Sequence, residues 1–233
     1  MGMETMNSKS RMSCEERKCR ILAAVRKVFA HKGLEGTTTR ELAKEAGVSE
    51  ALLYKHYPSK EALYQAMLGS CDGEFMGEIK KITSLESSTS TLVTLVHFMV
   101  GSMVNRRAPD VEVRVRLYLQ SILGDGEFAR LIISQKQESC SVTSKIADCV
   151  KAATLTGDIV ESPVPASLRA LFADRFAATL LSDLLPAKPA IDYGVPRDKL
   201  IEHAVRFILA GLGMKEEAIR RYYNPKALEL LVA

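Results

Sequence analysis

The segment Thr37–Tyr57 reads TTTRELAKEAGVSEALLYKHY and predicts two short helices that are joined by a tight turn. Thr38 and Glu41 stand three residues apart and form a capping box, which starts the first helix. Gly47 supplies the positive φ that such a turn requires, and Ser49 is a suitable cap for the second helix. This spacing predicts a helix-turn-helix, in which the second helix packs steeply across the first.

The residues on either side extend this segment into a larger helical unit. Ser13 and Glu16 form a further capping box, and apolar residues then recur with helical spacing until a stop at Gly33. After the helix-turn-helix, Pro58 prevents continuation of the helix. The serine that follows it is expected to cap a fourth helix, which begins at Lys60.

The second helix of the pair has an arc of residues that can face outward together, namely Glu50, Ala51, Tyr54 and Lys55. If its N-terminus enters a major groove, Tyr54, Lys55 and His56 meet the phosphate backbone. Hydroxyl groups and the amides at helix N-termini offer further donors for phosphate oxygens. Because an isolated helix-turn-helix can also be a packing corner with a solvated face, the motif alone leaves both interpretations open.

The whole run from Ile21 to Leu63 is similar to the DNA-binding domain of the tetracycline-repressor (TetR) family. The matching positions are Ile21-Leu22, Phe29, Gly33, Thr38-Thr39, Leu42-Ala43, Ala46-Gly47-Val48-Ser49 and Leu53-Tyr54-Lys55-His56-Tyr57-Pro58-Ser59-Lys60-Glu61-Ala62-Leu63.

The resemblance implies a sequence-specific transcriptional regulator, usually a repressor, which a small ligand releases from a palindromic DNA operator. The DNA contacts that it implies are Thr38, Thr39, Arg40, Ser49, Glu50, Ala51, Tyr54, Lys55, His56 and Lys60. Many members carry a second aromatic residue where this chain has Lys55. A lysine there suits a phosphate contact but could equally read a guanine.

The charge distribution agrees with a polyanionic partner. Residues 1–60 hold 12 Lys and Arg against 7 Asp and Glu, whereas the other 173 residues hold 20 basic and 21 acidic residues. A basic end on a near-neutral body is the electrostatic pattern of a nucleic-acid-binding domain.

The remainder of the chain predicts an all-α protein, because helical segments alternate with breaks and no stretch shows sustained alternation of period two. Breaks are expected at residues 84–90, 108–109, 124–126, 156–157, 162–165, 186–196 and 211–213. We expect three parts: a disordered polar arm over residues 1–12, a helix-turn-helix DNA-binding domain over 13–59, and a helical ligand-binding and dimerisation domain over 60–233.

The family would place an effector pocket among the helices after Lys60. Candidate lining residues are the Met and aromatic side chains Phe75, Met76, Phe98, Met99, Met103 and Tyr118. Such side chains suit small-molecule sites, but they are equally common as gap-filling core residues. Arginines that could attract an acidic ligand are Arg106, Arg107, Arg114 and Arg116, with plain surface charge as the alternative.

Two apolar segments are expected to pair across a twofold axis in a homodimer, by what the family implies. They are Leu168–Leu185 and Arg197–Leu212, and without the resemblance either could be internal core. In this interpretation Ile208 lies in the seam between the two copies.

No catalytic constellation is recognisable, so the chain is expected not to be an enzyme and to need no cofactor. His97 and His203 could meet at a metal, but a lone helical histidine is more often structural, and no metal site is expected. Five cysteines with no CxxC pair, and no secretory signal, predict a reduced cytoplasmic protein with no membrane partner. The alternatives are a TetR-like DNA-binding protein without an inducer, either partner-controlled or an activator, and an all-helical enzyme that uses its C-terminal cavity.

Overall fold

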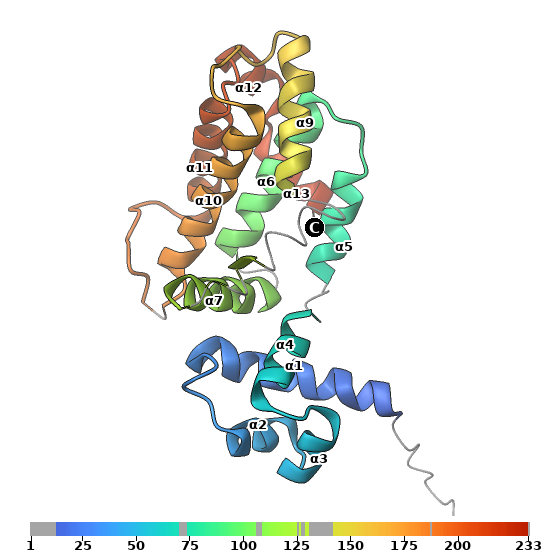
Figure 1. Ribbon diagram of the computed structural model, residues 1–233. Coiled ribbons are helices and arrows are strands. Elements are labelled where there is room, and N and C mark those ends of the chain that lie inside the picture. The colour runs from blue at the N-terminus through green and yellow to red at the C-terminus, as the bar shows by residue number, and fades with distance from the viewer. Residues whose placement is uncertain are drawn as a thin grey trace, which may run out of the picture. The chain divides into compact units, whose positions relative to one another are not determined.

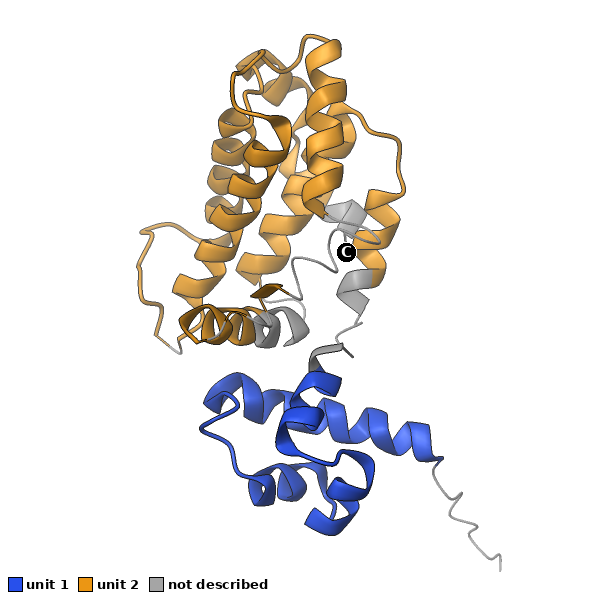
Figure 2. Cartoon of the chain, in the orientation of Figure 1, with its two compact units in different colours: residues 1–71 blue, residues 72–233 orange. Residues whose placement is uncertain are grey.

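The computed structural model describes residues 13–69, 74–105, 109–124, 126, 129–130, 142–186 and 188–232. The chain divides into two compact units, residues 1–71 and residues 72–233 (Figure 2). Over the described ranges the secondary structure is helical, and strand-like pairing is limited to an isolated bridge between Ile159 and Met214. The expected all-α class is therefore confirmed.

The described part of unit 1 consists of four helices: α1 (Cys14–Lys32), α2 (Thr39–Ala46), α3 (Glu50–His56) and α4 (Lys60–Gly69) (Figure 1). Its buried apolar residues come from all four helices and the turn before α4, and they include Ile21, Val25, Phe29, Leu42, Leu53, Tyr57, Leu63 and Met67. The rings of Phe29 and Tyr64 meet edge to face, with centroids 5.0 Å apart, and this contact joins α4 to α1.

The helix ends of unit 1 are those that the sequence predicts. Ser13 and Glu16 form a reciprocal capping box at the start of α1, and Thr38 and Glu41 do the same for α2. Ser49 accepts the Leu52 amide and so caps α3. Gly47 ends α2 with φ 65° and ψ 33°, the left-handed conformation that favours glycine at this turn.

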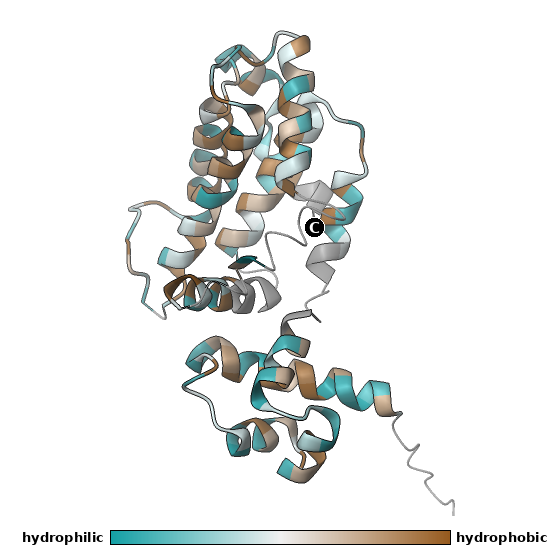
Figure 3. Ribbon diagram, in the orientation of Figure 1, coloured by the Kyte–Doolittle hydropathy of each residue, from teal (hydrophilic) through white to brown (hydrophobic). Residues whose placement is uncertain are grey.

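The helices described in unit 2 are α5 (Glu74–Thr83), α6 (Thr89–Asn105), α7 (Pro109–Leu123), α9 (Val142–Leu155), α10 (Ala166–Leu184), α11 (Arg197–Gly211), α12 (Glu216–Tyr222) and α13 (Pro225–Val232). Figure 1 shows α6 inside this bundle, with α9, α10 and α11 beside it. Most of α6 is accordingly apolar and buried, as expected for its run from Leu92 to Val104. Figure 3 shows brown apolar and teal polar positions sharing the same ribbon turns on the outer helices, as amphipathic helices require.

The breaks between helices also follow the sequence. For example, α6 begins at Thr89, near the end of the serine-rich stretch 84–90. Similarly, α10 begins directly after Pro165, and α11 ends at Gly211. The sequence-based division of the chain placed the domain boundary after Ser59, whereas the contacts of α4 assign it to unit 1 and put the boundary after Cys71. The predicted arm, residues 1–12, lies outside the described residues.

The expected role of Ile208 in an interface is wrong. The apolar residues named on the last strong helix are Leu200, Ile201, Ala204, Val205, Ile208, Leu209 and Leu212, and all of them are buried in the core of unit 2. Ile208 itself is only 4% exposed, whereas its neighbour Phe207 is 64% exposed. The sequence correctly predicts that α11 is an apolar helix, but its apolar residues lie on more than one face. The residues named for the interface face the core of unit 2.

No helix within the described ranges combines the length and the apolar character that crossing a membrane would require.

Candidate nucleic-acid interface

The outer face of α3 is polar and open, while its inner face is anchored in unit 1. Leu53 is 2% exposed and holds the helix against the core. On the opposite side Glu50, Ala51, Tyr54 and Lys55 are all exposed. These are the four residues that the helical period places on one arc, so the structure brings them together as expected.

Tyr54 is held in place from the neighbouring helix. Its hydroxyl lies 3.2 Å from the Thr39 Oγ1, and this hydrogen bond joins α3 to the first residue of α2. The Tyr54 side chain is still 46% exposed, which is high for a large aromatic residue. The bond therefore orients an aromatic hydroxyl that remains open to solvent.

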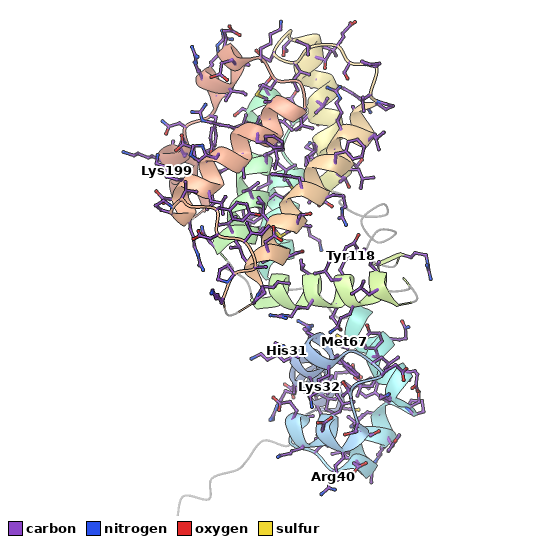
Figure 4. The ribbon with its side chains drawn as sticks, turned by 90° about the vertical axis from the view of Figure 1, so that its left-hand side faces the viewer. His31, Lys32, Arg40, Met67, Tyr118 and Lys199 are labelled. Atoms are coloured by element: carbon purple, nitrogen blue, oxygen red, sulfur yellow. The ribbon has the colours of Figure 1, made fainter. Side chains whose placement is uncertain are left out.

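Arg40 lies next to this pair on α2 and is exposed. Figure 4 shows its side chain projecting away from the ribbon of unit 1. A guanidinium in this position has donors to offer to a phosphate or to a base edge.

The hydroxyl groups of Thr38 and Ser49 already serve as helix caps. The Thr38 hydroxyl accepts the Glu41 amide at 3.3 Å and donates to the Glu41 Oε2 at 3.2 Å. The Ser49 hydroxyl accepts the Leu52 amide at 3.2 Å. Both residues are exposed, but their main structural work is to fix the starts of α2 and α3.

Lys60 and His56 are half-buried and have partners within unit 1. The Lys60 ammonium donates to the Thr37 carbonyl oxygen at 3.3 Å, and the Thr37 hydroxyl donates to the Gly33 carbonyl oxygen at 2.6 Å. The His56 Nδ1 lies 4.0 Å from the Cys14 Sγ. Thr37 thus fixes the connection between α1 and α2, a role that the sequence analysis did not assign to it.

One strong charge pair borders this surface. The Lys32 ammonium lies 2.6 Å from the Glu41 Oε1, and both side chains are partly exposed. The Lys32 contact, together with the hydrogen bonds from Thr38, lowers the pKa of Glu41 to about 2. Glu41 therefore stays ionised and neutralises Lys32, which leaves Arg40 and Lys55 as the more available cations.

The predicted effector residues of unit 2 have different surroundings. Phe98 and Met99 are 5% and 2% exposed and pack in the main apolar core, while Met103 is half-buried beside it. Tyr118 lies on α7 (Figure 4), where its hydroxyl accepts a hydrogen bond from Arg175 of α10. The side chains of Phe75 and Met76 lie outside the described residues, as do those of Arg106, Arg107 and Arg114.

A polar cluster at the contact of α7 and α10 was not foreseen. Arg175 pairs with the buried Asp174, stacks over the Tyr118 ring at 4.9 Å and also donates to its hydroxyl. Nearby, Arg116 donates to the Leu185 carbonyl oxygen at 2.9 Å, so this cation has a protein partner. The contacts between α7 and α10 join residues that are far apart in the sequence, so no local sequence pattern predicts them.

The histidines of unit 2 do not form a metal site. His97 is buried, with its Nδ1 3.4 Å from the Tyr223 hydroxyl, and His203 is exposed on α11. Within the described part of the chain, no group of three or more His, Cys, Asp or Glu residues has the arrangement of a metal centre.

Comparison with known proteins identifies the first unit. Residues 21–67 match the family model described as bacterial regulatory proteins, tetR family. The nucleoid occlusion factor SlmA of Mannheimia succiniciproducens is 35% identical over 78 residues, which are 33% of this chain and 36% of that protein. The SlmA of Vibrio cholerae is 35% identical over 87 residues, or 37% of this chain and 44% of that protein. The chain thus aligns with less than half the length of these curated relatives.

Solved structures extend the likeness to both units. A tetR-family regulatory protein from Rhodococcus RHA1 has a TM-score of 0.65 at 21% identity, with 88% of this chain and 100% of that chain covered. AibR, in complex with isovaleryl coenzyme A and operator DNA, has a TM-score of 0.63 at 18% identity, with 82% of this chain and 97% of that chain covered. At such identities these likenesses show a shared fold.

The family resemblance expected from Ile21–Leu63 is therefore confirmed, and it is a family of regulators rather than enzymes. Residues 21–67 form its DNA-binding domain, and the chain as a whole has the fold of its members. The chain thus carries a tetR-family regulatory domain at residues 21–67, and it shares the fold of solved tetR-family proteins.

Proposed function

We propose that the protein is a homodimeric transcriptional repressor, which binds a palindromic operator through α3 and leaves it when a small molecule binds unit 2. The observation that carries the DNA-binding part is the exposed polar arc of α3, fixed by the buried Leu53 and by the Thr39–Tyr54 hydrogen bond. A rigid, solvated helix face with cations at its edge has the form of a recognition helix.

The residues proposed to contact DNA are Thr38, Thr39, Arg40, Ser49, Glu50, Ala51, Tyr54, Lys55, His56 and Lys60. Within this set, Glu50 and Ala51 stand at the start of α3 and are suited to base edges in the major groove. Arg40 and Lys55 are exposed cations and are suited to phosphates.

An apolar face on unit 2 supports dimerisation. We define the α10–α11 face as Leu168, Leu171, Phe172, Phe176 and Phe207. Phe172 is 58% and Phe207 is 64% exposed, and the rings of Phe176 and Phe207 lie 4.9 Å apart. Large exposed aromatic side chains gathered on neighbouring helices are typical of a surface that a protein partner covers. A second copy is the proposed partner, because two half-sites of a palindrome require two recognition helices.

The effector is proposed to act by population shift, favouring a spacing of the two recognition helices that no longer fits successive major grooves. The half-buried Met103 is an adaptable apolar side chain and the Tyr118–Arg175 pair is polar, and small-molecule sites use both kinds of group. AibR, with the same fold, was solved with both isovaleryl coenzyme A and operator DNA, which supports an effector here as well.

A second candidate is a DNA-binding protein without an effector. Phe98 and Met99 favour it, because both are buried in a continuous apolar core rather than open to a guest. The relatives named as nucleoid occlusion factors match only 33% and 37% of the chain, so they fit either candidate.

The two candidates can be separated on an operator isolated by selection from random duplexes. The bound complex is titrated with a panel of acyl coenzyme A thioesters and small organic acids, and operator release is followed by fluorescence anisotropy. The repressor candidate predicts that one compound lowers operator affinity roughly 5- to 150-fold, as typical allosteric coupling does. Binding of a compound to unit 2 without any change in operator affinity would favour the effector-free candidate.

A further inference from the structure

The N-terminus of α1 and the end of α3 place a thiol beside an imidazole. Cys14 is the first residue of α1 and is exposed, and its Sγ lies 4.0 Å from the Nδ1 of His56. His56 is the last residue of α3, the helix proposed to enter the major groove. The two residues are 42 positions apart, so the pair is created by the fold.

The imidazole is oriented toward the thiol. The His56 Nε2 is buried and has no hydrogen-bond partner among the described residues, whereas its Nδ1 faces Cys14. In the tautomer protonated at Nε2, the Nδ1 accepts the proton of the thiol. A cysteine paired with a histidine in this way is the arrangement that activates a sulfur nucleophile.

The backbone at the start of α1 favours the same chemistry. Lys18 lies one helical turn further along α1, but its ammonium pairs with the Glu15 Oε1 at 2.9 Å and is largely neutralised. The amides of the first turn of α1 add partial positive charge. These amides favour the negative charge that develops on the sulfur during its reaction.

We propose that Cys14 is a modification site that forms a mixed disulfide with a low-molecular-weight disulfide, and that this modification weakens the binding of α3 to DNA. The thiol proton passes to the His56 Nδ1, and the sulfur attacks one sulfur of the disulfide RS–SR. A bond forms between Cys14 and that sulfur as the old S–S bond breaks. The leaving thiolate RS⁻ takes up the proton as RSH, so the cysteine is oxidised and half of the small disulfide is reduced.

An internal disulfide does not compete with this reaction on α1. Cys19 is also exposed on α1, five residues further along. Helical geometry puts residues five apart at a Cα separation of about 8 to 9 Å. A disulfide needs less than about 7 Å, so the two thiols react separately. Cys19 has no imidazole within hydrogen-bonding distance among the described residues and provides a matched control.

The effect on DNA binding rests on the proposed role of α3. A group such as glutathionyl on Cys14 adds bulk and negative charge beside His56, at the end of the helix where phosphates are proposed to lie. Like charges brought together oppose binding, and displacement of His56 removes one of the proposed contacts.

The first test measures the reaction without DNA. The reduced full-length chain is treated with oxidised glutathione near pH 7, and modification at each cysteine is followed by peptide mass spectrometry. Cys14 is expected to react at least fivefold faster than Cys19, and His56→Asn is expected to remove most of this advantage without slowing Cys19. Equal rates at Cys14 and Cys19, or an unchanged Cys14 rate in His56→Asn, would overturn the proposed site.

The second test measures operator affinity before and after treatment. The wild type and Cys19→Ser are expected to lose at least tenfold in affinity and to recover it with dithiothreitol, while Cys14→Ser keeps its affinity throughout. Equal sensitivity in Cys14→Ser would assign the effect to another cysteine and overturn the proposal. If the reduced wild type binds no duplex at all, the proposed function fails independently, and the rates of the first test still decide the modification site.

Discussion

Unit 1 and unit 2 are both helical, but they expose different kinds of side chain. Around α3 the exposed residues are mainly polar or charged, and the aromatic Tyr54 is tied through its hydroxyl to Thr39. On the α10–α11 face, Phe172 and Phe207 are exposed, and their side chains have no polar group that could form a hydrogen bond. A polar surface fits a hydrated polyanion, whereas an exposed aromatic surface fits a second protein surface. This difference is what the proposed function requires, with DNA at unit 1 and a second copy of the chain at unit 2.

The largest expected effect comes from a pair of neighbours on α11. Ile208→Asp places an unpaired charge in the core of unit 2 and should cost several kcal/mol, enough to unfold the unit. Phe207→Asp is the matched control, because it places the same charge on the exposed side of the helix. Denaturant unfolding should show a large loss of stability only for Ile208→Asp.

The same pair also tests the interface. Sedimentation should show a folded monomer for Phe207→Asp, since the charge lies in the proposed seam. If the Phe207→Asp protein dimerises like the wild type, the α10–α11 face is not the dimer interface.

Next in size is the loss of a proposed phosphate contact in unit 1. Lys55→Ala should weaken binding to all operators roughly tenfold near 0.1 M salt and should reduce the salt slope by about one unit. Lys44→Ala, an exposed lysine on α2 outside the proposed contact set, is the control and should leave the slope unchanged. Losses for Lys55→Ala that depend on the operator sequence would mean that Lys55 reads a base.

A smaller effect is expected from the hydrogen bond that joins α2 to α3. Tyr54→Phe removes the hydroxyl that bonds Thr39 and should weaken operator binding by about 0.5–1.5 kcal/mol, alike for different operators. If the hydroxyl acts by way of Thr39, then Thr39→Val in the Tyr54→Phe background should add little. Fully additive losses in this double-mutant cycle would show that the two residues act separately on DNA.

The smallest effect concerns acid stability. The pKa of Glu41 is lowered to about 2, mainly by Lys32, from an ordinary value of 4.5. A carboxylate with a lowered pKa in the folded state stabilises the fold above pH 4.5, and this contribution is lost as the pH falls toward about 2. Glu41→Gln should therefore lower the melting temperature at pH 6 and have little effect near pH 2.

Glu45→Gln on the same helix is the control for this comparison, because Glu45 forms no cap of α2. A melting-temperature difference between Glu41→Gln and the wild type that stays constant from pH 6 to pH 2 would contradict the assigned pKa.

The contrast between the two units also explains what the sequence could predict. The helix ends of unit 1 depend on neighbours within four residues, such as Ser13 with Glu16, so a local pattern is sufficient. The arc of α3 follows from the helical period once Leu53 is known to face inward. The boundary of unit 1 was harder, because α4 joins α1 through the contact of Phe29 with Tyr64.

In unit 2 the decisive contacts join distant segments. Phe207 and Ile208 are consecutive apolar residues, and composition alone does not say which one faces the core. The Arg175–Tyr118 contact spans 57 positions and the Cys14–His56 contact in unit 1 spans 42, so both depend on the packing of helices. Whatever depends on such packing had to be seen in the structure.

The most direct test of the central claim is selection of duplex DNA from a random pool by the full-length reduced protein. The account predicts enrichment of an inverted repeat whose half-sites are about one helical turn or a multiple apart, because two copies of α3 must reach successive major grooves. It also predicts that Phe207→Asp loses affinity for the full repeat while keeping weak binding to a half-site. Enrichment of no sequence, or of a single half-site bound by a monomer, would contradict the account.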